Sequence, residues 1–165
     1  PEALFVGNSR GVERPMLRDA LAAGIDCAVI GEGWDALLPA GRLLAPHIPN
    51  RELFRYYAAG SILLADHWPD MAREGFLANR LFDAAACGAT IVSDVVAGLD
   101  RVFGEAIPVC TGPDDLAAVL ATLRADPVAR RTRAAALQEM VRDRHSFDRR
   151  ALRILDVIRE RLTPL

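Results

Sequence analysis

The stretch EGFLANRLFDAAACGATIVSD, residues 74–94, decides the fold of this chain. It predicts a loop, a short helix with a small-residue face, a stop at Cys87-Gly88 and a buried strand. Asn79 and Arg80 stand at the start of that helix, and Asp83 lies one turn in. A helix N-terminus has free N–H groups and a partial positive charge, so it favours anions such as phosphate. Arg80 adds a bidentate donor and nearby carboxylates suit sugar hydroxyls, so the stretch indicates a site for a sugar diphosphate.

Short apolar segments alternate with helical ones on both sides of this stretch. The strand-like segments are residues 3–7, 27–30, 42–44, 62–65, 90–93 and 107–109. The helical segments are residues 16–23, 51–59, 79–86 and 116–124, followed beyond Pro127 by two helices that break near His145-Ser146. Buried strands alternating with helices imply a parallel sheet covered on both faces. We therefore expect an α/β fold, a Rossmann-like doubly wound parallel sheet of about six strands with C-terminal helices.

Ligands of doubly wound sheets bind at the carboxyl ends of the strands, near the switch in strand order. The loops that follow the first, fourth and fifth strands therefore form the candidate site, at residues 8–11, 66–80 and 94–99. Asn8 and Ser9 either donate to a phosphate or build a turn, and both interpretations stay open.

Composition excludes several classes of protein. The length of 165 residues suits one domain, and a net charge of −2 argues against nucleic-acid binding through a bulk basic surface. All 20 basic residues are Arg, which excludes Schiff-base lysine chemistry and a Walker-type lysine. Three scattered cysteines suggest neither disulfides nor a zinc site, and no apolar run is long enough to span a membrane. We expect a cytoplasmic protein without a metal or a cofactor.

The C-terminal part of the chain is rich in arginine. From Arg124 onward there are 11 Arg against 6 acidic residues. This segment is either a solvated face or a peripheral contact with anionic lipid on the inner face of the membrane.

From Tyr56 to Leu155 the chain resembles the C-terminal domain of the group 1 glycosyltransferases, and within them the branch of the spore-maturation CgeB-like proteins. The resemblance rests on NRLFDAAACGATIVSD, on GPDDLAAVL, on LRADP and on HSFDRRALRIL, in that order. It implies the nucleotide-sugar-binding half of a GT-B enzyme. Residues 1–165 are then a single Rossmann-like domain, a fragment of a longer two-domain chain whose missing N-terminal domain binds the acceptor. The last helix then has a third interpretation, as a brace for that domain.

By the same resemblance, Glu74 contacts the transferred sugar as the candidate catalytic residue, and Asp83 holds the ribose hydroxyls. Arg80, the backbone around Asn79 and Arg10 face the diphosphate of a UDP- or GDP-type sugar. Glu74 and Asp83 are nine positions apart, whereas the family commonly spaces two Glu eight apart. Asp66 and Asp70 are therefore fallback candidates for Glu74.

The resemblance implies a glycosyltransferase for hexosyl or related transfer that is inactive as the isolated domain. The alternative is a non-catalytic binding or interaction domain that kept the fold, which the unusual acid spacing favours. A dinucleotide-binding oxidoreductase needs GxGxxG after a strand, and residues 7–11 do not supply that motif.

Overall fold

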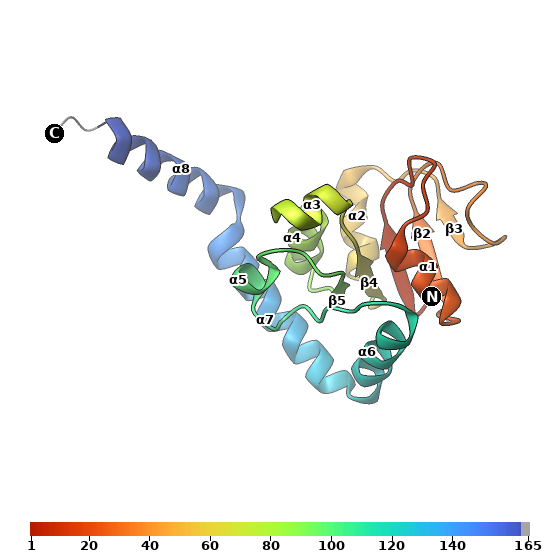
Figure 1. Ribbon diagram of the computed structural model, residues 1–165. Helices are drawn as coiled ribbons and strands as arrows, with labels where there is room; N and C mark the ends of the chain where they lie inside the picture. The colour runs from red at the N-terminus through yellow and green to blue at the C-terminus, as the bar shows by residue number, and fades with distance from the viewer. Residues whose placement is uncertain (163–165) are drawn as a thin grey trace.

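A parallel β-sheet forms the centre of the molecule. The structure is a computed structural model that describes residues 1–162. Within this range five strands lie in the order β3-β2-β1-β4-β5 with every pairing parallel (Figure 1). They are β1 (Ala3–Val6), β2 (Cys27–Ile30), β3 (Leu43–Ala45), β4 (Ile62–Ala65) and β5 (Ile91–Ser93). The strand order reverses between β1 and β4, so the predicted doubly wound, Rossmann-like fold is confirmed.

Helices cover both faces of the sheet because successive side chains of a strand point to opposite faces. Phe5 and Val29 pack into a cluster with α1 and α6, whereas Leu4 and Leu63 pack with α2, α4, α5 and α7. Both faces of the apolar strands are therefore buried, as in other parallel sheets. The helices are α1 (Pro15–Ala22), α2 (Asn50–Tyr57), α3 (Pro69–Glu74), α4 (Asn79–Ala86), α5 (Leu99–Phe103), α6 (Pro113–Ala125), α7 (Pro127–His145) and α8 (Phe147–Leu162).

Helix α4 follows from its sequence as predicted. Leu81, Ala84 and Ala85 are buried on its inner side, and the two small alanine side chains let the helix lie close to the sheet. Cys87 is the C-cap, and Gly88 after it adopts a left-handed φ of 75°, which ends the helix. The N-cap is Ala78, whose methyl group makes no capping hydrogen bond. The first turn of α4 therefore keeps backbone N–H groups that no side chain of the N-cap satisfies.

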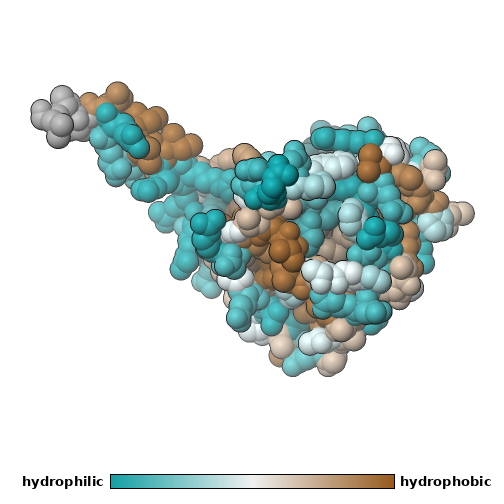
Figure 2. Space-filling view, in the orientation of Figure 1, coloured by the Kyte–Doolittle hydropathy of each residue, from teal (hydrophilic) through white to brown (hydrophobic). Residues whose placement is uncertain are grey.

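Helix α8 extends away from the rest of the molecule (Figure 1). The break that separates it from α7 falls at Ser146, as predicted, where the backbone is extended. All of its residues are exposed, and Figure 2 shows apolar surface along it. Its large exposed apolar residues are Phe147, Leu152, Ile154, Leu155, Val157, Ile158 and Leu162. Among residues 1–162, no helix has the length and apolar character needed to cross a membrane. A peripheral membrane contact through these helices stays a prediction.

Three segments differ from the expectations, and one of them is residues 99–103, which form α5 although no helix was predicted there. Residues 107–109 do not form a sixth strand but a single bridge from Val109 to Ser93. Pro108 has no N–H to extend a ladder, although its carbonyl accepts the N–H of Ser93 at 3.0 Å. The predicted loop at residues 66–73 contains α3, which begins at Pro69 and ends where Gly75 adopts a left-handed φ of 72°. A single prolyl φ and one glycine therefore suffice to form this short helix.

The loops after β1 and β2 pack against each other through a glycine. Gly31 has a φ of 147°, and a Cβ atom there would lie 2.2 Å from the carbonyl oxygen of Gly7. The same oxygen accepts a hydrogen bond from the Trp34 indole N–H at 2.8 Å. Any side chain on residue 31 therefore pushes the β1 loop away from its partners.

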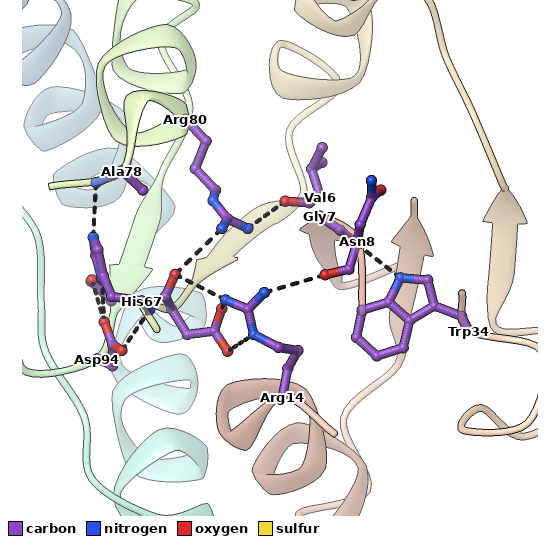
Figure 3. A network of polar contacts seen from close by, with 11 residues as sticks. Val6, Gly7, Asn8, Arg14, Trp34, His67, Ala78, Arg80 and Asp94 are labelled. Carbon is purple, nitrogen blue, oxygen red and sulfur yellow. Dashed lines mark hydrogen bonds and ion pairs between the residues drawn. The ribbon is translucent and has the colours of Figure 1, made fainter. Parts of the chain in front are cut away.

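A buried ion pair joins the loop after β1 to the end of β4 (Figure 3). The side chains of Arg14 and Asp66 are 2% and 1% exposed, and Arg14 Nε donates to Asp66 Oδ2 at 3.2 Å. Arg14 also donates to the Asn8 carbonyl at 3.3 Å and lies 4.2 Å from the ring centroid of Trp68. Burial raises the pKa of Asp66, and the guanidinium groups of Arg14 and Arg80 oppose that shift. The pair therefore stabilises the site region only while both partners are present.

We predict that Arg14→Met lowers the free energy of unfolding by about 3–5 kcal/mol, because it leaves the Asp66 carboxylate buried without its partner. The double variant Arg14→Met, Asp66→Leu is expected to lose less than the single variant. Urea denaturation measures both. Arg18→Met is the matched control, since Arg18 forms an exposed pair with Asp19, and its cost is expected to stay below about 1 kcal/mol. A double variant less stable than Arg14→Met would contradict the prediction.

We predict that Gly31→Ala destabilises the fold by more than about 2 kcal/mol, because the new methyl group meets backbone and the φ is unfavourable for alanine. Gly24→Ala is the control. Gly24 has a φ of 70° but open space around its Cβ position, so only the backbone cost of about 1–2 kcal/mol is expected there. Equal losses in urea denaturation would show that the contact with Gly7 does not matter.

Candidate functional site

The loops after β1, β4 and β5 meet at the carboxyl edge of the sheet, as the sequence predicts (Figure 3). Arg14 links the β1 loop to Asp66, the residue after β4. His67 beside it is bonded to Asp94, the residue after β5. These residues lie at the reversal in strand order, where doubly wound sheets bind their ligands.

Arg80 reaches from α4 across the ends of β1 and β4. Its guanidinium donates to the carbonyl oxygens of Val6, through Nη1, and of Asp66, at 3.4 Å through Nη2. Burial lowers the pKa of Arg80, while the Asp66 carboxylate opposes that shift. A Cβ atom at Gly7 would lie 2.7 Å from Arg80 Nη1, so the glycine leaves room for the guanidinium. Arg80 is thus fixed by main-chain oxygens, and its predicted contact with a diphosphate stays a prediction.

Arg10 differs from Arg80 because it is exposed. Its guanidinium carbon lies 5.3 Å from the ring centroid of Trp68, on the loop after β4. Its φ of 55° makes it the only non-glycine residue with positive φ among residues 1–162. A left-handed arginine costs roughly 1–2 kcal/mol, and such strain is concentrated at functional sites. Arg10 is therefore an exposed cation on a strained backbone in the predicted loop, and its contact with a diphosphate stays a prediction.

Asn8 and Ser9 use their side-chain oxygens inside the protein. Asn8 Oδ1 accepts the N–H of Glu32 at 2.9 Å. The Ser9 hydroxyl is buried, donates to the carbonyl of Gly33 and accepts the N–H of Gly11 at 3.0 Å. These bonds build the turn and tie it to the loop after β2. A phosphate contact by either residue stays a prediction.

His67 joins three segments around the start of α4 (Figure 3). Its Nδ1 lies 2.7 Å from Asp94 Oδ1, and its main-chain N–H donates to Asp94 Oδ2 at 2.8 Å. Its Nε2 accepts the N–H of Ala78 at 3.0 Å. The parts played by Arg14 and Asp94 in this region were not predicted individually. The available signals were that Asp94 directly follows a buried strand and that Arg14 precedes the proline that begins α1.

Asn79 and Asp83 lie one turn apart on the outer side of α4 and line one cavity. The cavity has a volume of about 610 Å³ and lies between α4, α7 and the start of α8. Its lining also includes Arg142, His145 and Arg150. Desolvation raises the pKa of Asp83, and the nearby Arg150 opposes that shift. The cavity thus combines a carboxylate with cationic groups beside the N-terminus of α4.

Glu74 lies apart from this network. It is the last residue of α3, its side chain is 58% exposed, and its Oε1 lies 2.8 Å from Nε of the adjacent Arg73. Of the two fallback acids, Asp70 is exposed in the first turn of α3, whereas Asp66 is held in its buried ion pair. The carboxylate of Asp66 is therefore occupied, and contact between Glu74 and a sugar stays a prediction.

No metal site is evident in residues 1–162, where no group of three or more His, Cys, Asp and Glu side chains is arranged to hold an ion. A search of curated proteins finds no match to the sequence.

Several solved structures share the fold at low sequence identity. Sucrose-phosphate synthase from Thermosynechococcus elongatus aligns with a TM-score of 0.76 and 19% identity, over 97% of this chain and 45% of that one. T4 phage BGT in complex with UDP-glucose aligns with a TM-score of 0.67 and 12% identity, over 86% of this chain and 44% of that one. The GtfA/B complex aligns with a TM-score of 0.68 and 13% identity, over 96% and 36%. This chain thus spans less than half the length of each.

A family model described as glycosyl transferase-like matches residues 10–156, which include all the strands after β1 and every helix through α7. The matched range also contains Arg10, the side chains of Arg14, Asp66, His67 and Arg80, and the residues that line the cavity beside α4. The chain therefore belongs to the glycosyl transferase-like family.

Proposed function

We propose that this domain binds a nucleotide-diphosphate sugar, of UDP or GDP type, as the sugar-donor half of a GT-B glycosyltransferase of the CgeB-like branch. The observation that carries the proposal is that Asn79 and Asp83 line one cavity at the N-terminus of α4. Arg80 belongs to the first turn of α4, and its guanidinium reaches from there to the end of β1. Groups suited to a diphosphate and to a ribose are thereby adjacent, in the order in which a nucleotide sugar presents them.

The diphosphate is proposed to bind at the first turn of α4. The N-cap Ala78 supplies no side-chain capping bond, so the N–H groups of Asn79 and Arg80 suit phosphate oxygens. The guanidinium of Arg80 contributes positive charge at the ends of β1 and β4. The exposed Arg10 adds a second positive charge from the loop after β1. Glycosyl transfer leaves negative charge on the departing diphosphate, and donors fixed in advance stabilise that charge.

The nucleoside is proposed to occupy the cavity of about 610 Å³. The Asp83 carboxylate then accepts hydrogen bonds from the ribose hydroxyls, one helical turn from the diphosphate. Arg142 and Arg150 line the same cavity and add positive charge. The volume lies within the range of about 300–1,000 Å³ that is typical of small-molecule sites.

The acceptor is assigned to a second domain. This chain aligns with less than half of each similar structure, and one of them is described in complex with UDP-glucose. We propose that a facing domain completes the cleft, so the 165 residues alone bind the sugar donor without hexosyl or related transfer. Glu74, exposed at the end of α3, remains the proposed sugar contact. A non-catalytic domain that kept the fold is the alternative, and the separation of Glu74 from the network favours it.

Calorimetric titration with UDP, GDP, TDP and ADP tests the proposal. Binding of one nucleotide with a Kd between about 1 mM and tens of micromolar, worth about 4–6 kcal/mol, is the expected result. Titration with the matching sugar conjugates then identifies the sugar. If no nucleotide binds, either here or with the full-length protein, sugar-donor recognition is refuted.

For Arg10→Gly we predict opposite effects on stability and binding. Glycine tolerates the left-handed φ, so the free energy of unfolding rises by about 0.5–1 kcal/mol. The lost guanidinium weakens binding of the diphosphate by about tenfold or more. Thermal denaturation and calorimetry measure the two effects, with the exposed Arg101→Ala on α5 as control. Unchanged affinity in Arg10→Gly removes Arg10 from the site.

For Asp83→Ala we predict loss of the preference for a ribonucleotide over its 2′,3′-dideoxy analogue. A charged hydrogen bond contributes about 1.5–3 kcal/mol, so the wild-type protein is expected to prefer the ribonucleotide by at least about tenfold. Competition titrations with both analogues measure the ratio, and Asp100→Ala on α5 is the control. A wild-type protein that does not distinguish the analogues would refute the ribose assignment.

A further inference from the structure

We propose that His67 is a positioning residue that orients the N-terminus of α4 for the diphosphate of the sugar donor. This inference rests on the proposed function and adds a residue to it that does not touch the ligand. The contacts of the imidazole fix its protonation state, its orientation and the helix that it holds.

The tautomer of His67 follows from its partners. A backbone N–H only donates, so the bond from Ala78 at 3.0 Å requires that Nε2 carry no proton. The ring proton is therefore on Nδ1, which donates to Asp94 Oδ1 at 2.7 Å. The ring is thus neutral, with one nitrogen donating and the other accepting.

The orientation of the ring is fixed from the side of β5. Asp94 binds both the ring and the main-chain N–H of His67, the latter at 2.8 Å. The Ser93 hydroxyl donates to the same carboxylate at 3.2 Å. The His67 side chain is 0% exposed. Because both ring nitrogens are bonded and the ring is buried, His67 neither contacts the sugar nor acts as a general base.

His67 holds the N-cap residue of α4 through the main-chain N–H of Ala78. Ala78 is the N-cap of α4, so its main-chain direction sets where the N–H groups of Asn79 and Arg80 point. Hydrogen bonds weaken steeply as they bend from linear geometry. A tilt of the first turn therefore lowers phosphate affinity even when the fold is intact. His67 thus ties the N-cap residue to the loop after β4, while the N–H groups of the first turn still have no side-chain cap.

A protonated ring cannot make this tie, because two N–H groups would then face each other at Ala78. The other charged groups of the network are Asp94 on the loop after β5, Asp66 at the end of β4, Arg14 before α1 and Arg80 on α4. The bond to Ala78 therefore requires a ring nitrogen that carries no proton.

Two variants test the inference, with UDP-glucose and GDP-mannose as probes. A glutamine amide offers one donor and one acceptor, so His67→Gln is expected to bind the preferred probe within about threefold of wild type. His67→Leu offers neither and is expected to bind it at least about tenfold more weakly, which corresponds to about 1.4 kcal/mol. Titrations are made well below the unfolding midpoint of each variant, so loss of stability alone does not change the measured affinity.

Rescue by His67→Gln separates positioning from a general structural role, because the amide restores an acceptor for the Ala78 N–H and a donor for Asp94. Folded His67→Leu with wild-type affinity would overturn the inference and leave the proposed function standing. If the wild type binds neither probe, nor any nucleotide in the earlier titrations, the proposed function fails first. A ¹⁵N spectrum that shows the His67 proton on Nε2 would overturn the inference whatever the titrations give.

Discussion

The polar groups at the carboxyl ends of the parallel strands are the constraint on which the site depends. The carbonyls of Val6, Gly7 and Asp66 lie where the sheet ends, and burial without a partner would be costly. Arg80, Trp34 and Arg14 supply the missing donors. Each of these side chains comes from a different segment. Satisfying the strand ends therefore also fixes the loops and the helix that form the candidate site.

The arginines at this edge serve two purposes. Arg14 and Arg80 are held by buried oxygens and set the geometry and the charge of the site. Arg10 is exposed on a left-handed backbone, so of these three arginines it is the one that solvent reaches most freely. A site built in this way has its donors in place before the ligand arrives. Such preorganisation is what stabilisation of a departing diphosphate requires.

Local rules predicted much of the architecture. The five strands, the helix at residues 79–86 and the break before α8 follow from composition, prolines and glycines, and their boundaries differ by at most one residue. The predicted strand at residues 107–109 is reduced to a bridge because Pro108 cannot extend the ladder. The helix at Pro69–Glu74 was missed because its signals are only a proline and a glycine.

The sequence by itself determined the class of fold, the family resemblance and the loops that surround the site, because these depend on local pattern and chain order. Only the tertiary structure decided the state of each polar side chain. Arg14 is buried against Asp66, 52 residues away, and His67 is closed between Asp94 and Ala78. Such pairings depend on how strands stack side by side. The spacing of residues along the sequence does not show which side chains will meet across the sheet. The same residue type is therefore buried in structural contacts at Arg14 and Arg80 and exposed at Arg10.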